Sequence, residues 1–253
     1  MSPPLLAADI TVDKRLKLTF VFMMASAACL PVRGEETDLA QDTIQKFFAS
    51  RGLQVDLKKR EVKVDASVCL KDGILEYVLC SPDSYEHESI FVTRSKPRYL
   101  HLALTMVGLR ECPFNNPYFF LIAKSPKLLR SRVEIDVEFK VDDRVGRSSL
   151  SNLLVNRADK DAEAPNDWIF LGSTMIEEKG KKVYAADRDG AVVSIVPNAG
   201  AVVQFGKEAG NPYHGEDQGF ELNPETAPKV GTNVKLIFKP AIASPAQGAL
   251  KKK

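Results

Sequence analysis

The sequence lacks both a strong excess of charge and any familiar catalytic loop. Its 253 residues include 35 Lys and Arg against 33 Asp and Glu, a formal net charge of +2. This near balance excludes the basic excess of a dedicated nucleic-acid-binding protein and the composition of an acidic, solvating chain. There is no Gly-rich phosphate loop, no Gly-x-Ser-x-Gly nucleophile turn and no His-Glu-x-x-His helix. No standard motif therefore indicates an enzymatic activity, although a hydrophobic content of 44% allows a sizeable core.

A long apolar run occurs only near the N-terminus. The basic residues 14–17 precede an apolar segment, residues 18–30, which ends in small side chains. This order is typical of a secretory signal peptide, and the run is too short for a permanent membrane anchor. We therefore predict that residues 1–34 are a removable signal segment and that the protein is exported to the periplasm or cell envelope. No transmembrane span is expected in the mature chain.

Cysteine usage leaves two questions open. Residues 26–29 (Ser-Ala-Ala-Cys) resemble a bacterial lipoprotein processing site, in which Cys29 would carry a lipid anchor, although Ser26 replaces the usual Leu. Ordinary cleavage between Ala27 and Glu35 is the favoured alternative. In either case Cys69, Cys80 and Cys112 remain in the mature chain. An odd number of cysteines in an oxidising compartment leaves one thiol unpaired or paired with another chain.

Hydrophobic periodicity predicts a mainly β domain. Residues 61–70 and 133–141 alternate between apolar and polar side chains, as half-buried strands do. Further short strand patterns separated by turn residues predict a bent antiparallel sheet or a β-sandwich with a few short helices, of α+β class. One helix near residues 96–108 is apolar on nearly all sides and is expected to be buried.

These patterns divide the chain into consecutive parts. After the signal segment we expect an N-terminal helix and linker at residues 35–59. The β-rich domain is predicted over residues 60–240, and a disordered basic tail over residues 241–253.

The dipeptide Asp72-Gly73 lies between two strand patterns and predicts a hairpin of residues 61–70 with residues 74–80. In that register Cys80 would lie opposite Asp65. Its Cα atom would then be about 13 Å from that of Cys69, which argues against a disulfide between them.

The densest group of polar side chains provides the candidate site. It comprises Glu76, Cys80, His87, Glu88 and His101. A turn at residues 83–84 would place Cys80 opposite His87, with Glu76 on the same face. Two histidines and a carboxylate, His87, His101 and Glu76, could bind a transition metal, and a cysteine beside a histidine could be an activated thiolate. The favoured alternative is that these residues only fix the hairpins and the helix, because a histidine on a buried helix usually bonds a backbone carbonyl.

A series of short landmarks resembles a known family. The landmarks are residues 73–76, Leu79-Cys80, residues 87–89, Pro97, residues 101–104, Gly108-Leu109, residues 168–170, Gly172-Ser173, residues 184–187, residues 190–194, Gly231-Thr232 and Val234. In order and spacing the chain is similar, over roughly residues 60–239, to the YdjY domain family. That family occurs in exported bacterial proteins and is named after an enterobacterial member associated with iron–sulfur proteins. The resemblance implies no activity, and no cluster-type run of cysteines supports an iron–sulfur role here.

We therefore expect a non-enzymatic binding or interaction module of the bacterial envelope. Its partner would be an envelope protein or a small ligand, and not a nucleic acid. One alternative is a metal- or thiol-dependent enzyme or redox protein that uses Glu76, Cys80, His87 and His101. A second alternative is a structural component that is held in the membrane by a lipid on Cys29.

Overall fold

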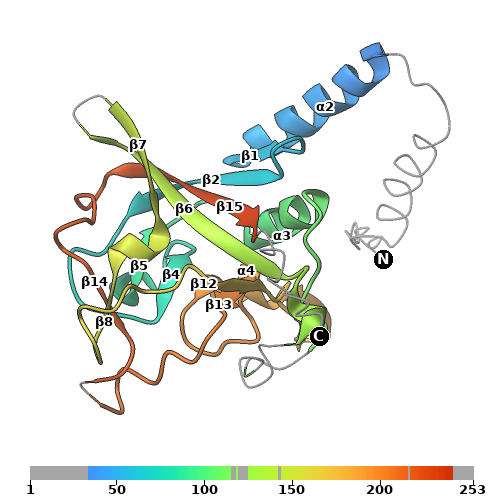
Figure 1. Ribbon diagram of the computed structural model, residues 1–253. Helices are drawn as coiled ribbons and strands as arrows, with labels where there is room; N and C mark the ends of the chain where they lie inside the picture. The colour runs from blue at the N-terminus through green and yellow to red at the C-terminus, as the bar shows by residue number, and fades with distance from the viewer. Residues whose placement is uncertain (1–33, 115–117, 119–124, 142–143, 216, 242–253) are drawn as a thin grey trace, which may run out of the picture. The chain divides into compact units, whose positions relative to one another are not determined.

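The computed structural model describes residues 34–114, 118, 125–141, 144–215 and 217–241 (Figure 1). The predicted signal segment, Cys29 and nearly all of the predicted tail lie outside these residues. The chain forms two compact units, residues 1–44 and 45–253, and helix α2 (Gly34–Ala49) runs through the boundary between them. All strands that the structure describes belong to the second unit.

The domain is rich in short strands, with 37% of residues in strands and 18% in helices, which confirms the mainly β prediction. The strands are β1 (Leu53–Asp56), β2 (Glu61–Val68), β3 (Ile74–Leu75), β4 (Tyr77–Cys80), β5 (Ser89–Val92), β6 (Arg132–Val141), β7 (Arg144–Ser149), β8 (Leu154–Asn156), β9 (Trp168–Phe170), β10 (Met175–Glu178), β11 (Lys181–Tyr184), β12 (Ala191–Ser194), β13 (Val203–Phe205), β14 (Phe220–Leu222) and β15 (Asn233–Pro240). The other helical elements are α3 (Pro97–Met106), α4 (Ala185–Asp189) and the 3-10 turns η1 (Glu86–Glu88), η3 (Pro126–Leu128) and η4 (Leu150–Leu153).

Eight strands close into a barrel, which corrects the prediction of an open bent sheet or a sandwich. Their order is β2, β15, β6, β9, β13, β12, β4 and β5, and β5 pairs again with β2. Strands β1 and β7 pair with β2 and β6, while β3, β14 and β8 form a separate small sheet and β10 pairs with β11. Periodicity did not reveal closure because alternation sets the face of each side chain and says nothing about which strand edges meet.

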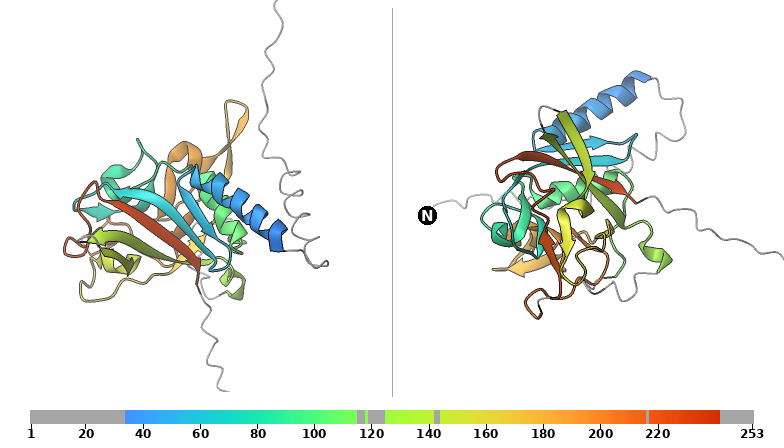
Figure 2. Two further views of the ribbon diagram at one scale, coloured as in Figure 1. Left: turned by 90° about the horizontal axis from the view of Figure 1, so that it is seen from above. Right: turned by 60° about the vertical axis from the view of Figure 1, so that its left-hand side comes forward.

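Strands β2, β15 and β6 run side by side (Figure 2), and their side chains show how the alternation fills the core. Phe238 of β15 lies between Val62 of β2 and Ile135 of β6. All three side chains are fully buried. An eight-stranded barrel is just wide enough for such side chains to fill its interior, so apolar burial is the main stabilising contribution here.

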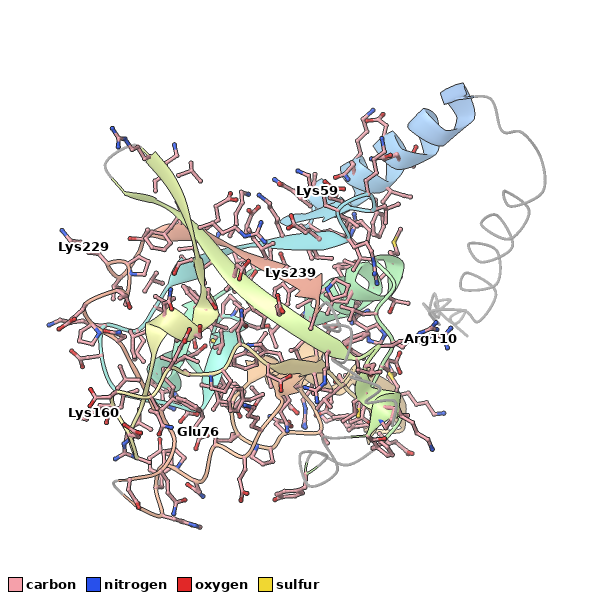
Figure 3. The ribbon with its side chains drawn as sticks, viewed as in Figure 1. Lys59, Glu76, Arg110, Lys160, Lys229 and Lys239 are labelled. Carbon is pink, nitrogen blue, oxygen red and sulfur yellow. The ribbon has the colours of Figure 1, made fainter. Side chains whose placement is uncertain are left out.

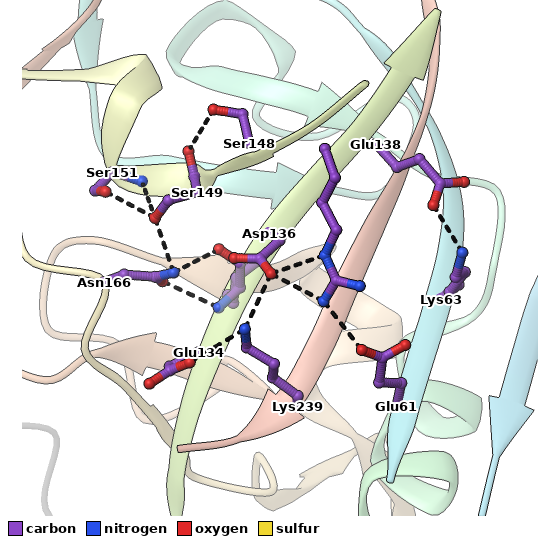
Figure 4. Close-up of polar contacts among 12 residues, drawn as sticks. Glu61, Lys63, Glu134, Asp136, Glu138, Ser148, Ser149, Ser151, Asn166 and Lys239 are labelled. Atoms are coloured by element: carbon purple, nitrogen blue, oxygen red, sulfur yellow. Dashed lines mark hydrogen bonds and ion pairs between the residues drawn. The ribbon is translucent and has the colours of Figure 1, made fainter. Parts of the chain in front are cut away.

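The opposite face of the same strands carries a network of ion pairs (Figure 4). Arg147 of β7 contacts both Asp136 of β6 and Glu61 of β2, with N–O distances of 2.9 and 3.0 Å. Lys239 donates to the same Asp136 carboxylate at 3.1 Å. Asp136 is only 9% exposed and was predicted to point outward into solvent. Two cations compensate its burial, and Arg147 links the strands on either side of β15.

Helix α3 forms where the sequence predicts it, but it is not buried on all sides. Leu100, Ala103 and Leu104 are buried, whereas Leu102 is 40% exposed. The helix packs against β2 and α4 along one face. The apolar residues on its other face are therefore left at the surface.

The predicted hairpin around Asp72-Gly73 does not form. β2 pairs with β1, β15 and β5, whereas β4 pairs with β12 and β5. The strand pattern at residues 74–80 is broken at Glu76, whose two neighbours belong to different sheets. Long-range partners thus replaced the local turn, since register on a strand buried on both faces is decided by the whole barrel.

The β-rich domain also begins earlier than predicted. Residues 53–56, placed in a linker by the sequence, form β1, and Leu53 and Val55 are buried against the barrel.

We predict that Phe91, at the closing strand β5, is critical for stability. Its ring is fully buried, and it lies between Val68 of β2 and Leu79 of β4. Phe91→Ala should lower the free energy of unfolding by about 3–5 kcal/mol, through lost burial and the cavity that remains. Urea unfolding followed by circular dichroism measures this. Val145→Ala, at a side chain that is 61% exposed, is the control and should change it by less than about 0.5 kcal/mol. If Phe91→Ala and Val145→Ala lowered the free energy of unfolding equally, Phe91 would not be packed inside a closed barrel.

Candidate functional site

The structure divides the predicted polar group among three places. The first contains Glu76, His87 and Glu88. The backbone N–H of Glu76 donates to the Glu88 carbonyl at 3.1 Å, and the Glu76 carbonyl accepts from Ile195 at 2.8 Å. Burial, together with the charge of Glu88, raises the pKa of the Glu76 carboxyl. His87 Nε2 lies 3.7 Å from the Glu88 carboxylate, but the imidazole is 75% exposed. These three side chains therefore lie near the surface, around the point where the backbone of Glu76 bonds to Glu88 and Ile195.

The second place is centred on His101 of α3. His101 Nε2 lies 2.9 Å from the Glu111 carboxylate. Its Nδ1 lies 2.9 Å from both the Gly172 carbonyl and the Tyr184 hydroxyl. The Tyr184 hydroxyl donates to the same carbonyl at 2.9 Å, and the imidazole packs edge-on against Phe170. Both ring nitrogens thus have protein partners. Through Gly172 and Tyr184, the histidine connects α3 to residues 71 and 83 positions away in the chain.

Gly172 is required for this arrangement. Its φ is +84°, and a Cβ atom added there would lie 2.5 Å from Cγ of Glu111. Only glycine allows the backbone carbonyl and the Glu111 side chain to approach His101 together.

The structure does not bring the three predicted metal ligands together. Figure 3 shows Glu76 and Arg110 on separate parts of the molecule, and Arg110 directly precedes Glu111, the partner of His101. His87 and His101 share no contact. Within the described ranges, no group of three or more His, Cys, Asp or Glu side chains could hold a metal ion. The arrangement therefore gives no support to a transition-metal site at His87, His101 and Glu76.

The third place holds Cys80, which is fully buried. Strands β4 and β5 are parallel, with Cys80 paired to Val92, so the predicted turn that set Cys80 opposite His87 is wrong. The Cys69 thiol and, after it, Ser89 and the Tyr85 backbone lower the pKa of the Cys80 thiol by hydrogen bonding, against the effect of burial. Cys69 and Cys80 are both free cysteines in the structure, and the hairpin from which their separation was predicted does not form.

A cavity of about 290 Å³ opens near these residues. It lies between the loop 81–85, which follows β4, and residues 187–190 at the end of α4. Its lining consists of Ser81, Pro82, Asp83, Ser84, Tyr85, Asp187, Arg188, Asp189 and Gly190. Three aspartates and one arginine line this space, together with the hydroxyl-bearing residues Ser81, Ser84 and Tyr85. The cavity is therefore polar and carries a negative balance of charge.

Hydrogen bonds within and between the two walls hold the cavity in shape. The N–H of Ser81 donates to the Gly190 carbonyl at 2.9 Å, and Ser84 Oγ donates to the Ser81 carbonyl at 2.6 Å. Burial acts to raise the pKa of the Glu86 carboxyl, but the N–H groups of Glu86, Asp83 and Ser84 outweigh it and lower that pKa. The cavity is thus largely preformed.

The α4 wall meets the loop closely at Gly190. Gly190 has φ +81°, and an added Cβ would lie 2.5 Å from Ser84 Oγ. On the other side, the Asp187 carboxylate accepts from the Arg98 backbone at 3.0 Å and pairs with its guanidinium.

A model of the YdjY domain matches residues 53–239. The chain belongs to the YdjY domain family. The match begins at the first residue of β1 and ends within β15, the first and last strands that the structure describes. No curated protein matches the chain, and no solved structure does.

Sequence reasoning missed the cavity of this YdjY domain. Residues 185–189 form the one-turn helix α4, which Gly190 ends in the left-handed conformation. The two walls are about a hundred residues apart in the chain, so no local pattern joins them. Tyr184, a partner of His101 that lies 83 residues away in the chain, was missed for the same reason.

We predict a loss of stability at high pH that depends on Tyr184. Burial, and then the negative charge of Asp187, raise the pKa of the Tyr184 hydroxyl above its usual range. Its contribution to stability is fully present below the unfolded-state pKa of about 10 and is lost as pH rises toward the folded-state pKa. The free energy of unfolding of Tyr184→Phe should therefore fall less steeply than that of the wild type as pH rises above about 10. At pH 7 this free energy should be lower by about 1 kcal/mol, because the variant lacks the hydrogen bond of the hydroxyl.

Urea unfolding at several pH values measures both effects. Tyr118→Phe, at a ring that is 53% exposed, is the matched control and should keep the wild-type pH dependence. The same dependence in Tyr184→Phe would show that this hydroxyl does not set the alkaline limit.

Proposed function

We propose that this YdjY domain is an exported binding module of the bacterial cell envelope, and that the cavity between residues 81–85 and 187–190 holds a small polar ligand bearing an amine. The preformed cavity carries this proposal. Its volume of about 290 Å³ lies at the lower end of the range for small-molecule sites. The rigid walls reduce the entropic cost of ordering a ligand.

The charge of the cavity favours an amine over an anion. Asp83, Asp187 and Asp189 contribute three carboxylates to the lining, against the single cation of Arg188. Arg98 neutralises Asp187 from outside, and Arg188 itself pairs with Asp189. One carboxylate beyond these pairs, Asp83, supports a charge-assisted hydrogen bond to an ammonium group.

Export is supported by the signal-like segment at residues 1–34 and by the resemblance to a family of exported proteins. Among the residues that the structure describes, no helix is both long and apolar enough to cross a membrane. A barrel of this kind would act as a rigid support for a binding surface outside the cytoplasm. A lipid on Cys29 would hold it at the membrane.

We predict that the full chain is exported from a Gram-negative host and recovered with an N-terminus between Ala28 and Glu35. Val21→Asp, within the apolar run, should leave the full-length chain in the cytoplasm, because a charge there blocks recognition of the signal. Val12→Asp, before that run, is the matched control and should be processed normally. Cell fractionation and mass spectrometry measure both location and length. Full-length wild-type protein in the cytoplasm would refute export, and loss of a lipid label in Cys29→Ser alone would identify the anchored form.

We predict that an amine probe binds at the cavity. Spermidine or glucosamine, titrated into ¹⁵N-labelled protein, should shift amide resonances of residues 81–85 and 187–190. Asp83→Asn should weaken binding about tenfold through loss of a charge-assisted bond. Asp159→Asn, an exposed aspartate elsewhere, should have no effect. Shifts spread over the acidic surface, or none with either probe, would refute this site.

A further inference from the structure

The outer side of helix α3 exposes apolar side chains in a row. Tyr99, Leu102 and Met106 follow one another at spacings of three and four residues, so they lie on one side of the helix. Leu102 is 40% exposed, and Tyr99 and Met106 are partly exposed. The row is therefore an apolar strip in contact with solvent.

An aromatic and a cationic side chain extend this strip. Phe47, which is also 40% exposed, packs edge-on against Tyr99, with ring centroids 5.9 Å apart. The Arg51 guanidinium lies 3.8 Å from the centre of the Phe47 ring and 4.8 Å from that of Tyr99. Cation–π attraction thus holds both rings at the surface. We call Phe47, Arg51, Tyr99, Leu102 and Met106 the α3 face.

Basic residues border the α3 face at both ends of the helix. Arg94 and Lys96 are exposed where α3 begins. Where it ends, Arg60 Nε donates to the Val107 carbonyl at 2.9 Å. Lys59, labelled in Figure 3, precedes Arg60 at the tip of the hairpin that joins β1 to β2. The apolar strip therefore lies between two groups of cations.

The segments that form and border this face are strongly basic. Residues 45–60 and 94–111 contain nine Lys or Arg, against only two acidic residues, Asp56 and Glu111. The whole chain has a formal net charge of only +2, so the remainder of the chain is net acidic. Positive charge is therefore concentrated around the α3 face.

Part of this charge is compensated inside the domain, and part is not. Arg98 of α3 pairs with Asp187. Among the residues that the structure describes, the side chains of Arg94 and Lys96 have no ion-pair partner. These two cations are available to an anion from outside the protein.

We infer that the α3 face is a membrane-docking surface, which binds a bilayer containing anionic phospholipid. This inference goes beyond the proposed ligand site, and it depends neither on the cavity nor on a lipid at Cys29.

The combination of an apolar strip with bordering cations fits the physical profile of a bilayer surface. Tyrosine and phenylalanine rings and a leucine lie favourably at the boundary between headgroups and acyl chains. Long basic side chains place their stems along this apolar layer while their charged ends reach the lipid phosphates. An acidic polymer would neutralise the cations but would leave the strip in water. Lipid therefore satisfies both parts of the α3 face.

Flotation with lipid vesicles tests the inference on the full chain. The protein carries Cys29→Ser, so it cannot be lipidated, and is mixed with vesicles of phosphatidylcholine alone or with about one third phosphatidylglycerol. It should float with the anionic vesicles and not with the neutral ones. Salt at about 0.5 M should release most of it, because the ions screen attraction to the phosphates.

Matched variants locate the binding. Lys96→Gln and Leu102→Ser should each lower the vesicle partition coefficient about fivefold, the first through lost charge and the second through lost apolar insertion. Lys181→Gln and Met175→Ser, at exposed residues of the β10–β11 hairpin, are the controls and should leave the coefficient unchanged. Every variant keeps the same N-terminal segment, so a difference between variants reports on the α3 face.

Thermal unfolding followed by circular dichroism confirms that each variant is folded; Lys96→Gln, at a fully surface position, keeps the test conclusive if Leu102→Ser is not. Equal flotation of all variants would place binding elsewhere and overturn the inference. So would equal binding to neutral and anionic vesicles, or no binding to either. A loss in Lys96→Gln without any loss in folded Leu102→Ser would indicate an acidic macromolecule as the partner, and would also overturn the assignment to lipid.

Discussion

Backbone hydrogen bonding between β2 and β5 is the interaction on which the rest of the structure depends. Without it, the eight strands would form an open sheet, and β5 and the end of β2 would expose N–H and C=O groups to solvent or to other chains. Closure satisfies these groups and encloses the apolar faces of the strands. The contact is short, so the barrel relies on packing around Phe91 to hold the seam.

Closure also determines where the polar residues lie. Because β4 and β5 run in parallel, the chain between them must cross from one end of the strands to the other. This crossing carries the loop that forms one wall of the cavity and places η1, with its exposed histidine, at the rim. A hairpin, which the local sequence favours, would have separated all of these features.

The polar side chains of the domain serve different physical purposes. The network around Asp136 neutralises a buried carboxylate on the outer face of the barrel, and the contacts of His101 connect α3 to distant turns. Residues around the cavity are instead held rigidly while their charged ends face solvent. We therefore place binding at the cavity and regard the histidine as a positioning element of the scaffold. Fixed walls and a packed interior suit a module that recognises a ligand without large conformational change.

The sequence by itself determined the strand periodicity, the position of α3 and membership of the YdjY family. It also placed most apolar side chains of β2 and β6 on the buried face, because alternation along a strand sets the face of each residue, but it did not reveal that Asp136 is buried as well. Only the tertiary structure decided that the sheet closes and that His101 contacts Gly172 and Tyr184. Pairing of strand edges and contacts over 70 or more residues depend on the packing of the whole barrel, and a local pattern carries no information about them.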